Sequence, residues 1–195
     1  MFWNYRTPGI PDELFETDQE VPITKEEIRA IAISKLRLKE GFAAIDIGCG
    51  SGSITVELCL QTNSNNVYAI DFNEKAINLT KKNLSKFGVK ALTMLARAED
   101  VLPTLPKVDA IMIGGSWGNI CQILTLAIDR LVNGGRIVID TILIETMYKA
   151  LDTLRYSKLS GIDITQATLA KGRQVSTGTM MLARNTVTII SATKP

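Results

Sequence analysis

Apolar and polar runs alternate along the chain in a strand–helix order that repeats five times. Short apolar runs predict strands over residues 42–47, 67–70, 91–95, 110–113 and 136–141. Helix patterns follow them over residues 53–60, 73–87, 99–102, 119–131 and 145–156. Strands that alternate with helices in this way are typical of a parallel sheet with helices on both faces.

The last part of the chain has a different pattern. Two strand-like runs, 162–169 and 180–190, are joined by segment 170–178, and we interpret them as a long hairpin that closes the sheet with an antiparallel strand. The predicted fold class is α/β, with a Rossmann-like, doubly wound, mostly parallel seven-stranded sheet. We expect one domain over 1–195, in which 1–40 form an N-terminal extension and 41–195 form the core.

A glycine-rich turn after the first strand is the main candidate site. Gly48, Gly50 and Gly52 stand at every second position between that strand and a helix. Glycine permits positive φ angles and lets a ligand approach closely, and the free N–H groups of a helix N-terminus favour polar or anionic ligands. Asp46 precedes the first glycine, and Asp71 ends the next strand, where a carboxylate can accept hydrogen bonds from ribose hydroxyls.

The N-terminal extension carries a second helix signal. The spacing of Thr24 and Glu27 fits a capping box and predicts a helix from Lys25 to about Leu36. We expect the extended segment before it to fold over the mouth of the glycine-turn site. Thr24 then either caps the helix or contacts the ligand, and the sequence leaves both interpretations open.

Composition removes several kinds of chemistry. The chain contains no histidine, which excludes His-based triads and zinc hydrolysis that depends on histidine ligands. Cys49, Cys59 and Cys121 are odd in number and far apart, so they predict neither a disulfide framework nor a metal site. The N-terminus has no signal-peptide pattern and no apolar run is long enough for a membrane span, so we expect a cytoplasmic protein.

The formal net charge of +2 is too small to argue for a nucleic-acid partner, but its distribution is uneven. Residues 134–195 carry eight Lys and Arg against four Asp and Glu. For Lys171, Arg173 and Arg184 we weigh an anionic substrate against an ordinary solvated surface, and the two remain open.

The glycine turn with its two carboxylates resembles the S-adenosylmethionine site of class I methyltransferases. Further stretches are similar to the decarboxylating cobalt-precorrin-6B C-15 methyltransferases of cobalamin biosynthesis, at residues 21–29, 113–116, 143–146, 170–173 and 178–185. The resemblance implies methyl transfer to C-15 of an anionic cobalt-corrinoid, with loss of CO2 from its C-12 acetate arm. It also implies S-adenosylmethionine as the cofactor and a homotetramer.

The resemblance implies cofactor contacts from Thr24, Gly48 to Gly52, Asp71 and Ala98, and the chemistry of the residues themselves adds the others. We expect cofactor contacts from Thr24, Asp46, Gly48, Cys49, Gly50, Ser51, Gly52, Asp71, Ala98 and Glu99. We expect substrate contacts from Gly114, Gly115, Ser116, Lys171, Arg173 and Arg184.

Two departures from the family pattern bear on ligand binding. The family has an aspartate where this chain has Arg97, which cannot accept a hydrogen bond, so adenine must use the backbone around Ala98 or Glu99. Trp117 replaces a glycine, and either stacks on a flat ligand or packs within its loop. The sequence identifies no catalytic residue. Glu145 is a candidate proton carrier, and the alternative is that it is a helix residue that faces solvent.

Two other functions compete with this interpretation. An RNA methyltransferase is one, because Arg97-Ala98-Glu99 also occurs in some of those enzymes. The modest net charge and the absence of an Asn-Pro-Pro-Tyr motif argue against it. A non-catalytic binding subunit with a methyltransferase fold is the other, and the intact glycines and Asp71 argue against that.

Overall fold

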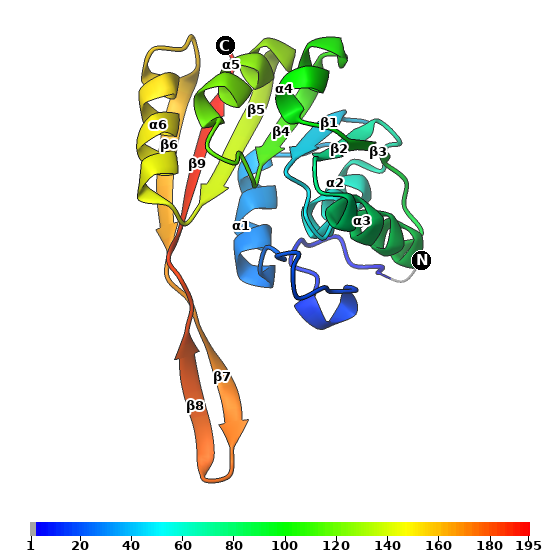
Figure 1. Cartoon of the computed structure of the whole chain (residues 1–195), viewed down its shortest axis with the longest axis vertical. Coiled ribbons are helices and arrows are strands. Elements are labelled where there is room, and N and C mark those ends of the chain that lie inside the picture. Colours follow the sequence, from blue (N-terminus) through cyan, green and yellow to red (C-terminus); the bar gives the residue numbers. More distant parts are fainter. Residues whose placement is uncertain (1–2) are drawn as a thin grey trace.

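The computed structural model describes residues 3–195 (Figure 1). Met1 and Phe2, which belong to the N-terminus considered for a signal peptide, lie outside the described residues. In the described part of the chain, no helix is both long enough and apolar enough to cross a membrane. The elements are, in chain order, η1 (Asp12–Leu14), α1 (Glu26–Leu36), β1 (Ala44–Ile47), α2 (Ser53–Thr62), β2 (Val67–Asp71), α3 (Glu74–Phe87), β3 (Leu92–Leu95), α4 (Ala98–Val101), η2 (Leu102–Thr104), β4 (Val108–Ile113), α5 (Ile120–Arg130), β5 (Leu131–Thr141), α6 (Ile144–Arg155), β6 (Ser160–Ala167), β7 (Ala170–Val175), β8 (Gly178–Ala183) and β9 (Val187–Thr193).

The main sheet has seven strands in the order β3-β2-β1-β4-β5-β9-β6. Strands β1 to β5 run parallel to one another, and β9 is antiparallel to both of its neighbours, β5 and β6. The predicted fold class is therefore confirmed. Because β2 and β4 lie on opposite sides of β1, the chain order reverses there, which is where open α/β sheets bind their ligands.

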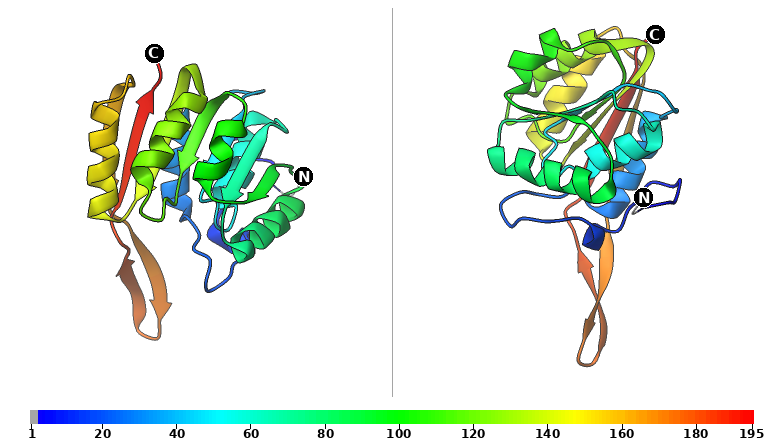
Figure 2. Two further views of the ribbon diagram at one scale, coloured as in Figure 1. Left: turned by 45° about the horizontal axis from the view of Figure 1, so that its top comes forward. Right: turned by 90° about the vertical axis from the view of Figure 1, so that its right-hand side faces the viewer.

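Helices cover both faces of this sheet (Figure 2). Alternate strand residues point to opposite faces, so Ile45 and Ile47 pack with α4, α5 and α6, whereas Ala44 packs with α1, α2 and α3. Met112 and Val138, on the strands next in order, point to the same face as Ala44. The central strands β1, β2 and β4 are buried on both faces, which is why they appear in the sequence as short continuous apolar runs.

The C-terminal hairpin extends beyond the end of the main sheet. The predicted antiparallel pairing is confirmed at its base, where β6 and β9 lie side by side in the main sheet. Segment 170–183 then forms a separate two-stranded ribbon, β7 and β8, which projects away from the body (Figure 1). The Thr168 and Thr186 hydroxyls, 2.9 Å apart, join the two strands where the ribbon leaves the sheet.

The predicted Thr24 cap is wrong. The N-cap of α1 is Lys25, which has extended backbone angles and makes no side-chain capping bond. Asp12 Oδ1 instead accepts the N–H of Glu26 at 3.0 Å, from a segment outside the helix. A capping motif describes only local spacing, so a cap supplied by a distant residue escapes it.

A buried arginine fixes the N-terminal segment to the sheet layer. Arg29 is fully buried, and its Nε donates to Glu57 Oε1 of α2 at 2.8 Å. The other nitrogens of its guanidinium donate to Asp12 and to the backbone carbonyls of Thr24 and Ile10. These bonds hold residues 22–25 beside the glycine turn, as expected for a segment that covers the mouth of the site.

Candidate functional site

A cleft runs along the carboxyl ends of β1, β2, β4 and β5. It consists of three adjoining cavities. The β2 cavity, of about 30 Å³, lies between Asp71, Ala98 and Ser116. The loop cavity, of about 420 Å³, lies over the glycine turn, and the β5 cavity, of about 340 Å³, lies beyond Gly114. Gly48 lines the first two and Gly114 the last two, so the cavities form one continuous site.

The glycine turn has the backbone that its sequence predicts. The φ angles of Gly48, Gly50 and Gly52 are 72°, 55° and 76°, in the left-handed region that side chains disfavour. A Cβ at Gly48 would lie 2.6 Å from the backbone N of Gly115, and one at Gly52 would lie 2.8 Å from Thr80. These two glycines therefore allow protein segments, rather than a ligand, to approach closely.

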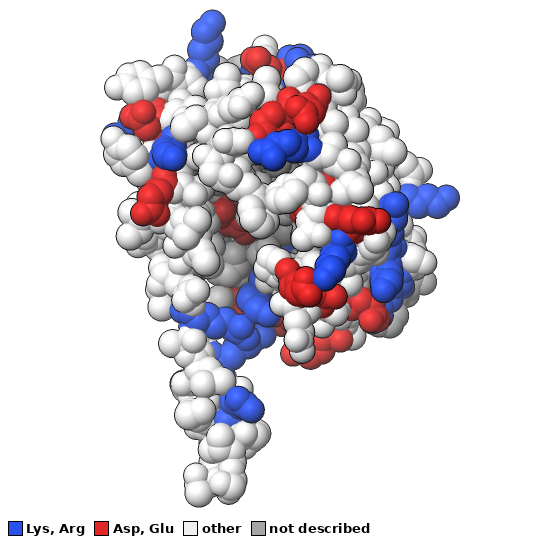
Figure 3. Space-filling view, viewed as in Figure 1, with Lys and Arg blue, Asp and Glu red and all other residues white. Residues whose placement is uncertain are grey.

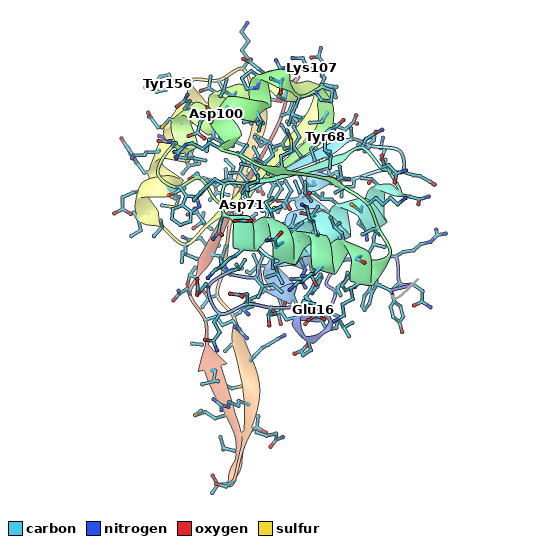
Figure 4. All side chains as sticks on the ribbon, turned by 45° about the vertical axis from the view of Figure 1, so that its right-hand side comes forward. Glu16, Tyr68, Asp71, Asp100, Lys107 and Tyr156 are labelled. Carbon is cyan, nitrogen blue, oxygen red and sulfur yellow. The ribbon has the colours of Figure 1, made fainter. Side chains whose placement is uncertain are left out.

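Asp71 shapes the turn from the end of β2 (Figure 4). Its Oδ2 accepts the N–H of Gly50 at 3.0 Å, and its Oδ1 accepts the N–H of Asn73 at 2.9 Å. Each carboxylate oxygen has a further lone pair, so the side chain can still accept hydroxyl hydrogen bonds in the β2 cavity, which it lines. Asp71 therefore braces the turn as well as facing the cleft.

Ser51 marks where a ligand fits. Its hydroxyl is buried and has no hydrogen-bond partner among the described residues. A buried polar group without a partner costs free energy, so Ser51 Oγ is suited to a bond with a ligand in the loop cavity. Thr24, Cys49 and Gly50 line the same cavity. The Cys49 thiol lies 3.4 Å from Thr80 Oγ1, and burial raises its pKa far above the ordinary range, so it is not a reactive thiolate.

Asp46 lies behind the turn and lines none of the three cavities. Its carboxyl is almost completely buried and accepts a hydrogen bond from the Thr55 hydroxyl at 2.5 Å. Burial raises the pKa of Asp46 to about 7. The residue therefore supports the turn from within the layer between β1 and α2.

Ala98 and Glu99 both line the β2 cavity, opposite Asp71. Ala98 is the first residue of α4, and Glu99 Oε1 accepts a hydrogen bond from Asn119 Nδ2 at 2.5 Å. The Arg97 guanidinium lies 3.8 Å from the same oxygen, and its side chain is largely exposed. Glu99 thus supplies a hydrogen-bond acceptor on this side of the cleft, which the Arg97 side chain cannot do.

The predicted substrate residues separate into two groups. Gly114, Gly115 and Ser116 lie at the centre of the cleft, and Arg184 lines the loop cavity. Lys171 and Arg173 line none of the three cavities. Basic side chains gather where the hairpin joins the body (Figure 3).

The two remaining cations of the hairpin have different surroundings. Lys171 pairs with Glu27 at 2.9 Å and with Glu26 at 3.2 Å, and the bond to Glu27 raises the pKa of Lys171. Arg173 is exposed further along β7. Antiparallel register places Lys171 opposite Leu182 and Arg173 opposite Met180, so both cations share one face of the ribbon.

Asp140, at the carboxyl end of β5, is a site residue that the sequence analysis missed. It lines both the loop cavity and the β5 cavity. Burial raises the pKa of Asp140 to about 7. A carboxylate at a strand end was the signal that identified Asp71, and the same signal was available for Asp140. Glu145, in contrast, is exposed on α6 and lines none of the three cavities.

Large apolar side chains form the rim of the β5 cavity. Trp117, Ile142 and Leu143 line it and are each more than half exposed. Trp117 has a φ angle of 44°, and its ring packs edge-on against Phe72 with the ring centroids 4.8 Å apart. It therefore packs within its surroundings and still presents an exposed ring. Apolar side chains gathered beside a cleft are typical of a surface that binds a partner or a ligand.

Comparison with known proteins assigns the chain to a family. The model of the precorrin methyltransferase domain matches residues 13–194. The chain is 50% identical, over the full length of both proteins, to a protein of Saccharolobus solfataricus named probable cobalt-precorrin-6B C(15)-methyltransferase (decarboxylating).

Two solved structures are similar over nearly all of the chain. One, described as a precorrin 8W decarboxylase of Methanobacterium thermoautotrophicum, is 36% identical with a TM-score of 0.89, over 94% of this chain and 98% of that one. The other, a precorrin-6Y C5,15-methyltransferase of Geobacter metallireducens, is 32% identical with a TM-score of 0.89, over 98% and 100%. The chain belongs to the precorrin methyltransferase family, and its fold is that of the class I methyltransferases.

Proposed function

We propose that the protein transfers a methyl group from S-adenosylmethionine to C-15 of cobalt-precorrin-6B and removes CO2 from the C-12 acetate arm. The observation that carries this proposal is the continuous cleft around Gly114. One side of it, over the glycine turn, has the unpartnered Ser51 hydroxyl. The other side has a wide apolar rim. A methyl donor and a flat methyl acceptor can therefore bind in separate parts of the cleft, which meet at the loop that contains Gly114.

The residues of the turn suit this cofactor. Asp71 and Glu99, with the backbone of Ala98, would hold the adenosine part in and around the β2 cavity. Ser51 and Thr24 would hold the amino-acid part in the loop cavity. The cofactor supplies an electrophilic methyl group on a sulfonium. The protein has mainly to align donor and acceptor and to exclude water, and alignment alone lowers such barriers by about 7–11 kcal/mol.

Two features of the cleft suit a corrinoid substrate. The conjugated ring of a corrinoid is flat and apolar, so it can pack against the exposed side chains of Trp117, Ile142 and Leu143. Its acetate and propionate arms are ionised at neutral pH, and Arg184 offers a guanidinium that binds a carboxylate through two hydrogen bonds.

We also propose a homotetramer, in accordance with the family resemblance. The projecting ribbon exposes Val175, Met180, Met181 and Leu182, and an exposed apolar strand pair of this kind favours association with another chain. We expect light scattering on the purified protein to give the mass of four chains.

The thiols of Cys49, Cys59 and Cys121 are unpaired, which supports a reducing compartment such as the cytoplasm.

A single assay separates this function from its two competitors. The protein is incubated with cobalt-precorrin-6B and S-adenosylmethionine that carries a labelled methyl group, and the product is followed by mass spectrometry. We expect the mass to rise by one labelled methyl and to fall by one CO2. Label found in bulk RNA instead would indicate an RNA methyltransferase, and cofactor binding without turnover on either substrate would indicate a binding subunit.

A further inference from the structure

Asp140 stands out among the carboxyl groups of the cleft. Of the described residues, three acidic side chains line its cavities, namely Asp71, Glu99 and Asp140. Asp71 accepts two backbone N–H bonds and Glu99 accepts a bond from Asn119. Asp140 has no side-chain hydrogen bond or ion pair with any other residue in the described chain, although it is half-buried. Its carboxyl is therefore free to act on a ligand.

The position of Asp140 is central to the cleft. It points to the same sheet face as Val138, toward the layer of α1 and α2. One of its oxygens lies 3.5 Å from where a Cβ of Gly114 would stand, so this carboxyl lies beside the loop between the two large cavities. It lines both of them, so it faces the donor side and the acceptor side together.

The proposed reaction requires a proton to move between two carbons of the substrate. In net terms, the methyl group replaces a hydrogen at C-15, and a hydrogen replaces the carboxylate on the acetate arm. When CO2 leaves, its bonding electrons pass through the conjugated ring and form the new bond to the methyl group. The arm is left as an exocyclic methylene, and C-15 still carries its hydrogen. One proton must then leave C-15 and one must reach the arm carbon, with no net gain or loss.

We propose that the carboxyl of Asp140 carries this proton, taking it from C-15 as a carboxylate and giving it to the methylene carbon as an acid. The inference rests on the proposed function. With no histidine in the chain, a carboxyl group between donor and acceptor is the group best placed for a transfer in both directions. Burial holds the pKa of Asp140 near 7, so both protonation states are accessible at neutral pH.

The charged groups around Asp140 agree with this role. Burial is what raises the pKa of Asp140; its charge in turn raises the pKa of Asp46 on β1, and the cations Lys25 and Arg184 line the same loop cavity. The neighbour of Asp140 on β9 is Ile189, which is apolar.

The test compares Asp140→Asn with the wild-type protein, using cobalt-precorrin-6B and labelled S-adenosylmethionine. The amide has the shape of the carboxyl but cannot carry the proton. Labelled methyl transfer reports on the first step, and the absorption spectrum and NMR of the corrinoid report on the conversion of the methylene into a methyl group. We expect this conversion to slow by about 10²-fold or more, with adenosylhomocysteine affinity within about twofold of wild type. Asp140→Glu should restore part of the rate, and Asp152→Asn, on the exposed side of α6, serves as the matched control.

Two results would overturn the inference. One is an Asp140→Asn protein that forms the final chromophore at the wild-type rate. The other is a loss of adenosylhomocysteine affinity of more than about tenfold in Asp140→Asn, which would make Asp140 a cofactor anchor. Absence of methyl transfer by the wild-type protein would instead contradict the proposed function. The pH profile adds an independent check, because the conversion should change near pH 7 in the wild type and not in Asp140→Asn.

Discussion

A single residue can decide whether the cleft forms, and Gly48, which has no side chain, is the clearest case. A Cβ at this position would lie 2.6 Å from the backbone N of Gly115, so the first and fourth strand ends could not approach as they do. We expect Gly48→Ala to lower the melting temperature and to abolish adenosylhomocysteine binding, measured by thermal unfolding and calorimetry.

The control for this substitution is Gly88→Ala. Its φ angle of 68° is close to the 72° of Gly48, but no atom lies within 4 Å of its added Cβ. Both variants therefore carry a similar backbone strain, and only Gly48→Ala carries the clash. If the two bind adenosylhomocysteine equally well, the contact between Gly48 and Gly115 is not what forms the site.

The buried Asp46 predicts a pH dependence of stability. Its pKa of about 7 in the folded protein lies above the ordinary value of 3.8, so between these values the folded state holds a proton that the unfolded state has lost. The free energy of unfolding should therefore fall as the pH rises from about 4 to about 7 and then level off. Urea unfolding across this range should show a smaller fall for Asp46→Asn, and the wild-type fall for Asp152→Asn. A fall of wild-type size in Asp46→Asn would contradict the assignment.

How well the sequence predicted individual residues depended on whether the signal was local. The glycines and Asp71 were identified because strand ends and turn backbone follow from neighbouring residues. The cap of α1 was wrong because Asp12 supplies it from outside the helix. The Arg29–Glu57 pair was missed because the two residues come together only in the folded chain.

Strands and helices determine which cations reach the substrate. Arg184 follows β8 at the base of the ribbon and lines the loop cavity, whereas Arg173 lies further out on β7. We therefore expect Arg184→Ala to weaken corrinoid binding about tenfold or more while adenosylhomocysteine affinity stays the same. Binding would be measured by absorption titration with the corrinoid. Arg173→Ala is the matched control for a subunit acting alone, and an equal loss in both variants would show that the outer ribbon also binds substrate.

The five strand–helix units were predictable and the ribbon was not. Each unit has a continuous apolar run followed by a helix pattern, and the helix predicted over 73–87 is α3, with Asn73 as its N-cap and Gly88 as its C-cap. The ribbon has the same β-type pattern as β6 and β9, so the sequence did not show where pairing in the sheet ends. That boundary depends on how far the body of the protein extends beside the strands.

The N-terminal segment depends on one buried side chain, Arg29, for its position across the fold. Arg29 and Glu57 are both buried, so Arg29→Met would leave the Glu57 carboxylate with only the backbone N–H groups of Gly9 and Ile10 as partners, and it would also remove the Arg29–Asp12 pair. We expect a loss of about 3–5 kcal/mol in the free energy of unfolding, measured with urea. Lys75→Met breaks a pair with Glu20 in which both side chains are exposed, and it should change stability little. A similar small change in Arg29→Met would mean that the buried pair does not hold the segment in place.

The position of β9 between β5 and β6 has a consequence for how the protein is made. A ribosome releases β6 well before β9, yet β6 has no partner in the sheet until β9 arrives. The nascent chain can assemble its parallel half early, but the antiparallel edge must wait until β9 has been synthesised. A ribosome stalled within the last strand would hold a chain with two unpaired strand edges, which is the kind of intermediate that chaperones recognise.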